Sequence, residues 1–399
     1  MIFGLSMNTG RDLGTNSDAR GVGGVGDYPY PWDPSNARQI LQWTIAHRLD
    51  HLLFGLELGN EQNNKYTAQQ QAHNFAVLHN LTVELWPDAS LRPVLLGPDP
   101  HSLHGPSGSQ LQWIADWLDG CKTLGVPVYG VTHHEYVEVD PSPSGFVSAN
   151  TLALNGAIAA AINHTVRQHD AEVRIFGGEI GPHNGGSPPC DHTSMRWAVF
   201  GDSLWYADAL AAKALNGYSG LCRQDFIGAD YGMLDCRSGS PLPDYYTALL
   251  WTRTMGARVL AVLATDMANR SLPPDTSSIR VYAHCATGEV GQAGGVTLLA
   301  INLGNRSTTL HRGSASAGEV NAFVLTPSPD PSSSLTPQGG LMGTGAMLNG
   351  QLLKLGAGGQ APATPPKTIA GAATPLVVPP TAIAFFVVPG AKHPDCIES

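Results

Sequence analysis

Residues 52–61 read LLFGLELGNE, an apolar run that stops abruptly at a glycine, an asparagine and a glutamate. Such a run is typical of a strand buried on both faces, as in a parallel sheet covered by helices. A second stretch, RIFGGE at residues 174–179, ends in the same way at Glu179. A charged group at the end of a buried strand has lost water, so Glu61 and Glu179 are the first candidates for a functional site.

Strand and helix patterns alternate around these two stretches from the start of the sequence to about residue 256. The predicted strands span residues 1–8, 51–61, 92–99, 126–136, 172–179 and 218–224. The predicted helices span residues 35–48, 67–85, 109–125, 148–170, 194–217 and 244–256. This order predicts an α/β fold in which six strand–helix units build a parallel sheet.

The pattern changes beyond residue 256, where apolar runs are separated by turns rather than by helices. The predicted strands here span residues 278–288, 294–304, 321–327 and 381–390. They predict an antiparallel β-sandwich, with the low-complexity stretch 356–375 as a surface loop. The sequence therefore predicts two domains, at residues 1–256 and 257–399.

Charge and composition exclude several classes of protein. The net charge of −10 argues against nucleic acid as a partner, and no apolar stretch is long enough for a transmembrane segment. None of the cysteines forms the Cys-x-x-Cys pair of a zinc or redox site. Glycosylation sequons favour a lysosomal or secreted protein, whose signal peptide would have been lost with a missing N-terminus. The sequons are at Asn80, Asn163, Asn269 and Asn305.

The two glutamates suggest acid–base chemistry. The carboxyl ends of barrel strands meet at one rim, so Glu61 and Glu179 should open onto the same side. Carboxyls about 5 Å apart are typical of a retaining glycosidase, and about 6.5–9.5 Å of an inverting one. The alternative is two strand-end carboxylates in unrelated salt bridges.

Neighbouring residues favour a sugar substrate. Asn60 can bind a sugar hydroxyl, the stretch THHEY at 132–136 can orient a carboxylate, and the glycines of HNGGS at 183–187 can offer backbone N–H groups to an anion. Neither a Gly-x-Ser-x-Gly nor a His-Glu-x-x-His motif occurs in the sequence, which argues against an esterase or a metalloprotease.

The motifs LELGNEQN, LLGPD, VTHHEY, GGEIGPHNGGSP, CRQDFIGADYGML, PLPDYYTALLWTRTMG and AFFVVPGAKHPDCI together resemble glycoside hydrolase family 79, the family of heparanase. The resemblance runs over nearly the whole chain. It implies a (β/α)8 TIM-type barrel followed by a β-sandwich, and a retaining β-glucuronidase of endo or exo type that acts by double displacement. Its substrate would be a heparan sulfate-like or other glucuronate-containing polysaccharide or glycoside, and the resemblance implies no cofactor and no metal.

Individual residues take their expected roles from this resemblance. Glu61 resembles the acid/base and Glu179 the nucleophile, while Cys285 and Cys396 match a disulfide that closes the sandwich. The predicted substrate-binding residues are Asn60, Asp99, His133, Tyr136, Gly185, Gly186, Gln224 and Tyr231. We further expect a raised pKa at Glu61, because its neighbours are apolar and a second carboxylate is near. Cys222 and Cys236 flank the loop of Tyr231 and are candidates for a second bridge.

The sequence also departs from the family pattern. Gln62 replaces a usual proline and Glu135 a usual tyrosine, and both should alter the pocket wall rather than the chemistry. Most of the basic residues that hold sulfate in heparanase are missing, leaving Lys65, His101 and His104. The chain begins at what resembles the third barrel strand, so two strand–helix units are expected upstream or in a separate N-terminal chain. The competing interpretation is a truncated, catalytically inactive glycan-binding relative.

Overall fold

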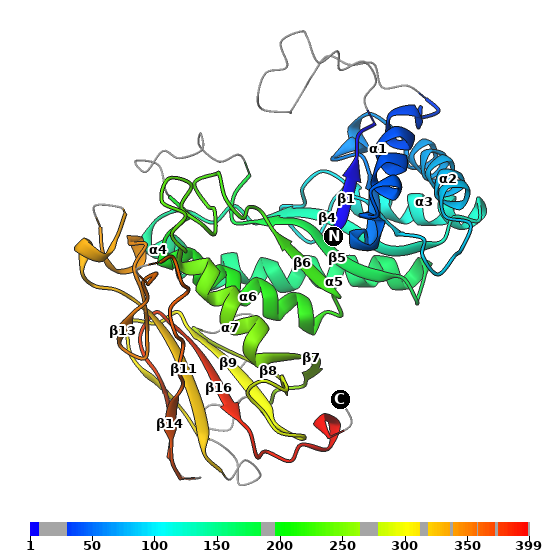
Figure 1. Cartoon of the computed structure of the whole chain (residues 1–399). Helices are drawn as coiled ribbons and strands as arrows, with labels where there is room; N and C mark the ends of the chain where they lie inside the picture. The colour runs from blue at the N-terminus through cyan, green and yellow to red at the C-terminus, as the bar shows by residue number, and fades with distance from the viewer. Residues whose placement is uncertain are drawn as a thin grey trace. The chain divides into compact units, whose positions relative to one another are not determined.

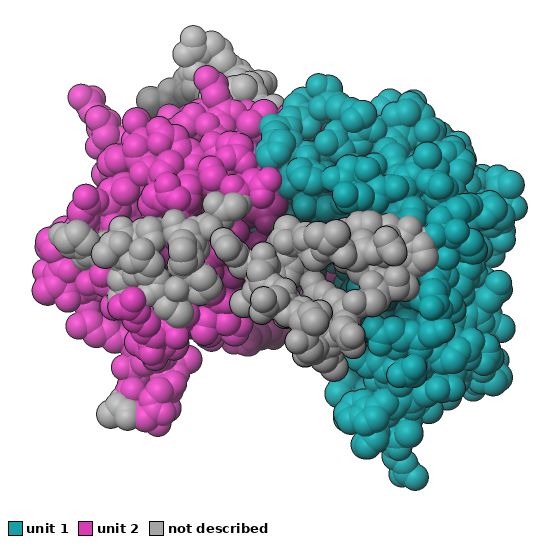
Figure 2. Space-filling model, turned by 90° about the horizontal axis from the view of Figure 1, so that it is seen from above, with its two compact units in different colours: residues 1–135, 158–180, 217–222 teal, residues 136–157, 181–216, 223–399 magenta. Residues whose placement is uncertain are grey.

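The computed structural model describes residues 1–7, 30–184, 196–263, 278–311, 318–335, 338–356, 358–371 and 374–397. The chain forms two compact units, which Figure 2 distinguishes by colour. Unit 1 comprises residues 1–135, 158–180 and 217–222, and unit 2 comprises residues 136–157, 181–216 and 223–399. Within the described residues, no helix is both long enough and apolar enough to cross a bilayer.

Six strands form a single sheet, in which they follow one another in sequence order (Figure 1). All of this sheet belongs to unit 1 except the last residues of β4, β5 and β6. The strands are β1 (Ile2–Leu5), β2 (Gly55–Leu58), β3 (Val94–Pro98), β4 (Val128–Tyr136), β5 (Arg174–Gly181) and β6 (Gly220–Arg223). Strands β1 to β4 pair in parallel, with Leu56 opposite both Phe3 and Leu95. Each predicted strand of this region is therefore confirmed.

A helix follows each of these strands, as the sequence predicts. The helices are α1 (Ser35–Ala46), α2 (Ala68–Leu85), α3 (Ser109–Thr123), α5 (Ala149–His169), α6 (Phe200–Leu215) and α7 (Pro243–Thr254), with a short α4 (Pro143–Phe146) before α5. The alternation confirms the predicted α/β fold of barrel type.

Helix α2 illustrates how local sequence and packing agree in unit 1. Thr67 and Gln70 form a reciprocal capping box at its start, in which each side chain accepts a hydrogen bond from the other's backbone N–H. Phe75 of α2 meets Trp117 of α3 edge to face, with ring centroids 5.0 Å apart. A side chain at Gly97 of β3 would overlap the Phe75 ring, so the glycine allows the helix to approach the sheet closely.

Unit 2 contains the antiparallel strands. Its larger sheet has the order β13-β12-β11-β16-β9-β8-β7, with β14 also paired to β11, and β10 pairs with β15 in a second sheet. The strands are β7 (Met255–Leu260), β8 (Ile279–Ala286), β9 (Val296–Asn302), β10 (Thr308–Leu310), β11 (Val320–Pro327), β12 (Ala346–Leu348), β13 (Gln351–Leu352), β14 (Lys367–Ile369), β15 (Leu376–Val378) and β16 (Ala382–Val388).

The two sheets of unit 2 share a core. Every residue of β16 is buried, and its side chains Ala384 and Phe386 pack in one cluster with Leu376 and Val378 of β15. Two antiparallel sheets around a common apolar layer are the predicted sandwich architecture. The predicted surface loop 356–375 is wrong in one part, because β14 lies within it and pairs with β11 while Ile369 packs against the core. The predicted domain boundary at residue 256 falls inside β7 and stays a prediction.

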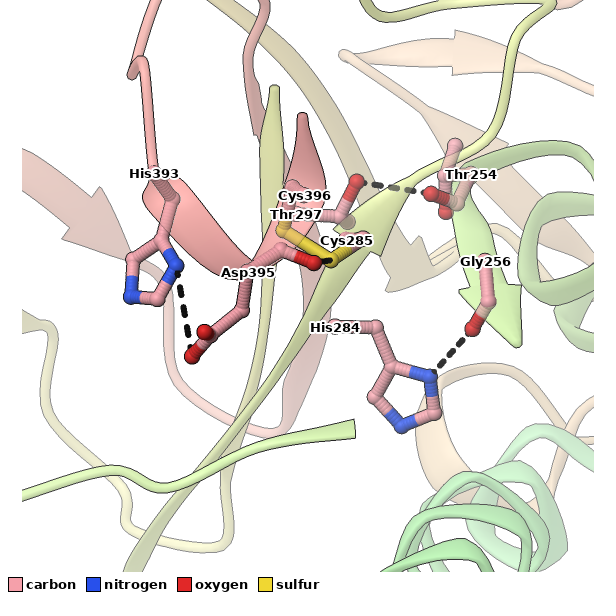
Figure 3. The surroundings of a disulfide bond; sticks show 8 residues. All are labelled: Thr254, Gly256, His284, Cys285, Thr297, His393, Asp395 and Cys396. Carbon is pink, nitrogen blue, oxygen red and sulfur yellow. Dashed lines mark hydrogen bonds and ion pairs between the residues drawn. A yellow bond between two sulfur atoms is a disulfide. The ribbon is translucent and has the colours of Figure 1, made fainter. Parts of the chain in front are cut away.

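The disulfide between Cys285 and Cys396 is confirmed and joins β8 to a short 3-10 helix near the chain end, η7 (Pro394–Cys396) (Figure 3). Beside it, His284 Nδ1 lies 2.7 Å from the carbonyl oxygen of Gly256. A bridge between Cys222 and Cys236 is wrong, because Cys222 is a free thiol whereas Cys236 is in a disulfide.

Candidate active site

Glu61 occupies a sharply turned backbone at the end of β2. Its φ of +54° lies in the left-handed region, and the preceding Gly59 has a φ of +87°. The Glu61 N–H donates to the carbonyl oxygen of Asp99, 3.0 Å away, which ties this turn to the residue after β3. A backbone conformation that costs free energy and is held by a neighbouring strand is common at functional sites.

Glu179 reaches the same place from β5. Its Oε1 lies 3.7 Å from Nδ1 of His134, and Oε1 of Glu61 lies 2.8 Å from that same nitrogen. The ligand atoms of Glu61, His134 and Glu179 all lie within 4.8 Å of one another. The structure therefore brings the two predicted carboxylates together around one imidazole. Both keep access to solvent, with side chains 28% and 26% exposed.

His134 belongs to the stretch THHEY, which the sequence predicted to orient a carboxylate, but it was not itself among the predicted site residues. It lies on β4 with its side chain only 1% exposed, and its Nε2 forms an ion pair of 2.9 Å with Asp99 Oδ1. Burial lowers the pKa of His134, but the negative charges of Asp99, Glu61 and Glu179 outweigh burial and raise it to about 11. His134 is therefore an imidazolium near neutral pH, and Asp99 contacts this imidazolium. The predicted role of Asp99 in substrate binding stays a prediction.

The neighbouring His133, predicted as a pocket residue, has different partners. Its Nε2 lies 2.8 Å from the Tyr218 hydroxyl. Successive side chains of a strand point to opposite faces, so His133 and His134 cannot share a site on β4. The negative charge of Glu135 acts on Tyr218, which puts Glu135 on the His133 side of the strand. The alternation of side chains along β4 is the sequence signal that could have shown which of the two histidines faces the glutamates.

The electrostatics of Glu61 differ from the prediction. Burial alone would raise the pKa of Glu61. The hydrogen bond and charge of His134, the charge of His101, whose Nε2 lies 3.9 Å away, and the Ser102 hydroxyl together hold this pKa below its usual value. The prediction of a raised pKa is therefore wrong, because it considered the second carboxylate and not the cation between the two.

A third carboxyl, Glu57, lies within β2, four residues before Glu61. Its Oε1 is closed off from solvent. Burial and the negative charge of Asp99 raise the pKa of Glu57 to about 7, although Thr132 and His134 act in the opposite direction. Glu57 is thus largely a neutral acid at slightly acidic pH. The sequence could have identified Glu57 as a site candidate, because it lies between the buried Leu56 and Leu58. Side chains alternate along a strand, so Glu57 points to the opposite face of the sheet from these two leucines.

Glu61, His134 and Glu179 are also residue types that bind metals. A metal-bound imidazole must present a lone pair to the ion. Both nitrogens of His134 instead face carboxylates, with Nδ1 2.8 Å from Glu61 Oε1 and Nε2 2.9 Å from Asp99 Oδ1. The cluster therefore fits a carboxylate–imidazolium network better than a metal centre.

The other predicted site residues are distributed as follows. Asn60 is exposed beside Glu61 in unit 1, and Gln224 lies in unit 2. Tyr136 and Tyr231 are buried in unit 2, where the Arg223 guanidinium donates to the Tyr231 carbonyl oxygen. That guanidinium is itself held between the buried carboxylates of Asp202 and Asp244, at 2.9 and 2.8 Å.

Three predicted residues, Gly185, Gly186 and Asn269, lie outside the described residues. The remaining sequons are at Asn80 on α2 and Asn305, both exposed, and at Asn163 on α5. The predicted roles of all these residues stay predictions.

A parallel sheet of strand–helix units, with two carboxylates meeting at strand ends, is the arrangement typical of glycoside hydrolases of the barrel class. The sequence profile described as "Glycosyl hydrolase family 79, N-terminal domain" matches residues 1–211. The chain belongs to glycosyl hydrolase family 79.

Relatives with established names support this membership. Heparanase-like protein 1 of Arabidopsis thaliana is 30% identical over 406 residues, which cover 92% of this chain and 68% of the relative. Baicalin-beta-D-glucuronidase of Scutellaria baicalensis is 26% identical, with 98% of this chain and 69% of the relative covered. Inactive heparanase-2 of Homo sapiens is 26% identical, with 92% and 60% covered. The chain thus spans between 60% and 69% of the length of these relatives.

Solved structures agree on the fold. CelM2, a bifunctional glucanase-xylanase from a metagenome library, is 12% identical with a TM-score of 0.55, and 96% of this chain and 76% of that chain are covered. A family GH39 β-xylosidase from Caulobacter crescentus is 12% identical with a TM-score of 0.54, and 91% and 74% are covered. These likenesses confirm the predicted fold class.

Proposed function

We propose that the protein is a retaining β-glucuronidase that hydrolyses glucuronate-containing glycans or glycosides. The observation that carries this proposal is the approach of Glu61 and Glu179, whose ligand atoms lie within 4.8 Å of each other and of His134. Retaining glycosidases need their carboxyls about 5–5.5 Å apart, because the nucleophile must touch the anomeric carbon directly and no water stands between. An inverting enzyme would need a wider gap.

The reaction divides between the two glutamates. The Glu179 carboxylate attacks the anomeric carbon while protonated Glu61 gives its proton to the leaving oxygen, which forms a glycosyl ester on Glu179. Glu61, now ionised, takes a proton from a water molecule, whose oxygen displaces Glu179 and restores both carboxyls. Because the pKa of Glu61 is lowered, the protonated form that starts the cycle is abundant only at acidic pH.

The substrate class rests on the resemblance and on the relatives. The name of baicalin-beta-D-glucuronidase states that this relative acts on a β-D-glucuronide. Gly185, Gly186 and Tyr231 match the residues that hold a glucuronate carboxylate in the family. A neutral glucoside would leave such donors without their partner, and an unpaired donor costs about 1–3 kcal/mol where it is buried. We therefore expect glucuronides to be preferred over glucosides.

Hydrolysis of an aryl β-glucuronide and an aryl β-glucoside across pH tests this proposal, with proton NMR of the first product anomer as the stereochemical readout. A β-glucuronate product that appears first would support retention, and an α-product would refute it. Glu179→Gln should abolish hydrolysis of every substrate. Glu61→Gln should lose less rate on an activated aryl leaving group than on a polymer, because such a group needs little protonation.

A matched control is Glu84→Gln, which removes an exposed carboxylate of unit 1 that pairs with Arg38 and should leave activity intact. If the wild type hydrolysed no glucuronide at any pH, the chain would instead be a glycan-binding relative of the inactive type. Faster hydrolysis of the glucoside would refute the carboxylate pocket while leaving the two glutamates in place.

We also propose that the protein is secreted or lysosomal. The exposed sequons Asn80 and Asn305 and the disulfide between Cys285 and Cys396 support an oxidising, glycosylating route. Expression in a eukaryotic host followed by glycosidase treatment should lower the apparent mass. An unchanged mass, together with recovery of Cys285 and Cys396 as free thiols, would refute this proposal.

A further inference from the structure

One side chain connects the groups of the candidate site, and neither the family profile nor the names of the relatives assigns it a role. Nδ1 of His134, on β4, lies 2.8 Å from Oε1 of Glu61 and 3.7 Å from Oε1 of Glu179. Nε2 of the same ring lies 2.9 Å from Oδ1 of Asp99. Three separate strands and the turns that follow them therefore converge on one buried imidazole. A residue that touches both carboxyls can influence each protonation state of the cycle.

We propose that His134 is a positioning residue for the proton donor: its Nδ1–H orients Glu61 through Oε1, its positive charge confines the working pH of the site to the acidic side, and Asp99 holds the imidazolium in place. The inference deepens the proposed function and rests on it for its catalytic meaning. Its electrostatic effect on Glu61 can be measured without turnover.

The two carboxyl oxygens of Glu61 have different partners. Oε1 accepts from His134 Nδ1, and the Ser102 hydroxyl donates to it at 3.5 Å. Oε2 has the more distant His101 at 3.9 Å. A carboxyl held through Oε1 leaves Oε2 as the oxygen that carries the proton toward a leaving group. The fixed backbone turn at Glu61 and the buried ring of His134 make this orientation rigid.

Charge sets the direction of the effect. The groups that face His134 and Glu61 are Glu57 on β2, Asp99 and His101 after β3, and Glu179 on β5. The free thiol of Cys222 on β6 faces Glu57 and Asp99. Among these groups, His134 is the cation in direct contact with Glu61. An opposite charge at this distance lowers the pKa of a carboxyl by about 1–3 units, so its removal should move the titration of Glu61 up by a comparable amount.

The reaction cycle uses this charge in both steps. In the free site the imidazolium stabilises two nearby anions that would otherwise repel each other. When Glu179 becomes an ester, it loses its negative charge, and Glu61 is then the one ionised carboxyl beside Nδ1 of His134, while Asp99 still faces Nε2. Glu61 is thereby kept ionised at the stage when it must accept a proton from water. The cost is that the first step requires an acidic medium to protonate Glu61.

The test compares the pH dependence of kcat/KM for an aryl β-glucuronide in the wild type, His134→Gln and Asp99→Asn. His134→Gln removes the positive charge. It should shift both limbs of the bell-shaped pH profile of kcat/KM upward by about one pH unit or more, and lower the maximum of kcat/KM. Removing the negative charge of Asp99 should lower the maximum and leave the bell in place or move it downward. A purely structural role would lower activity in both variants without this difference in sign.

A matched control is His169→Gln, which breaks a similar histidine–aspartate pair of 2.9 Å between His169 and Asp119, elsewhere in unit 1. Its profile should superimpose on that of the wild type. The inference would be overturned if the pH profile of His134→Gln did not shift, or if the profiles of both His134→Gln and Asp99→Asn shifted upward. The proposed function would stand in either case.

A second measurement needs no activity and covers the case of an inactive wild type. Carbon-13 NMR of labelled glutamate carboxyls, with the Glu61 signal assigned by its loss in Glu61→Gln, follows the titration of this group directly. The signal should titrate about one pH unit or more higher in His134→Gln than in the wild type. If His134→Gln does not fold, the double variant with Asp99→Asn, which removes both charges of the pair, replaces it. An unchanged midpoint in the folded variant would overturn the inference.

Discussion

Glu57→Gln is the most informative single substitution, because it replaces a partly buried acid by a neutral side chain of nearly the same shape. Glu57 lies on β2 between Leu56 and Leu58, four residues before Glu61. Burial and the charge of Asp99 raise its pKa to about 7 from a usual value of 4.5. The folded protein therefore holds a proton on Glu57 that the unfolded chain releases at lower pH.

The size of the effect follows from this difference of about 2.5 pH units. Each unit corresponds to about 1.4 kcal/mol, so ionised Glu57 destabilises the folded state by up to about 3.5 kcal/mol. Water reaches part of the side chain, which makes this value an upper bound. Since the folded pKa is the higher one, the penalty is absent below pH 4.5, grows as the pH rises toward 7, and is constant above it.

Chemical denaturation at several pH values between 4 and 9 measures this dependence. We expect Glu57→Gln and the wild type to have similar free energies of unfolding near pH 4, and the variant to be more stable by up to about 3.5 kcal/mol near pH 8. Glu84→Gln is the control: the pKa of Glu84 is lowered by Arg38, so this variant should gain no stability at alkaline pH. A stability difference between Glu57→Gln and the wild type that did not change with pH would refute the reasoning.

Three further substitutions test packing and charge. Replacing Cys285 or Cys396 by serine opens a loop whose ends are 111 residues apart; we expect a loss of about 4–5 kcal/mol in denaturant titrations, and a wild type equally stable with and without reductant would contradict this. In Gly178→Ala the new Cβ would lie 2.6 Å from Asp99 Oδ1, so we expect the aspartate to move and kcat/KM to fall at least about tenfold, whereas full activity would exclude a strict position for it. In Arg223→Gln two buried aspartates lose their cation, and the free energy of unfolding should fall by roughly 3–5 kcal/mol, against no change if the network were solvated.

The sequence by itself determined the strands β1 to β6 and the long helices described within the first 256 residues. Among the ten strands β7 to β16 it determined only β8, β9, β11 and β16. Helix α2 illustrates the reason, because its capping box and apolar face are encoded within about twenty neighbouring residues. The two carboxylates were also accessible, since a buried strand that ends in a glutamate is visible in the sequence alone. Their meeting followed from the rule that parallel strands end at a common edge.

Only the tertiary structure decided which side chains complete the site. His133 and His134 are adjacent in the sequence, and the one-residue difference in strand parity separates a ring beside Tyr218 from a ring between two glutamates. The pKa of Glu61 was predicted with the wrong sign because Coulomb interactions depend on distances between residues that are 73 positions apart. Sequence patterns record periodicity along the chain, whereas charge, burial and hydrogen bonding depend on separations in space.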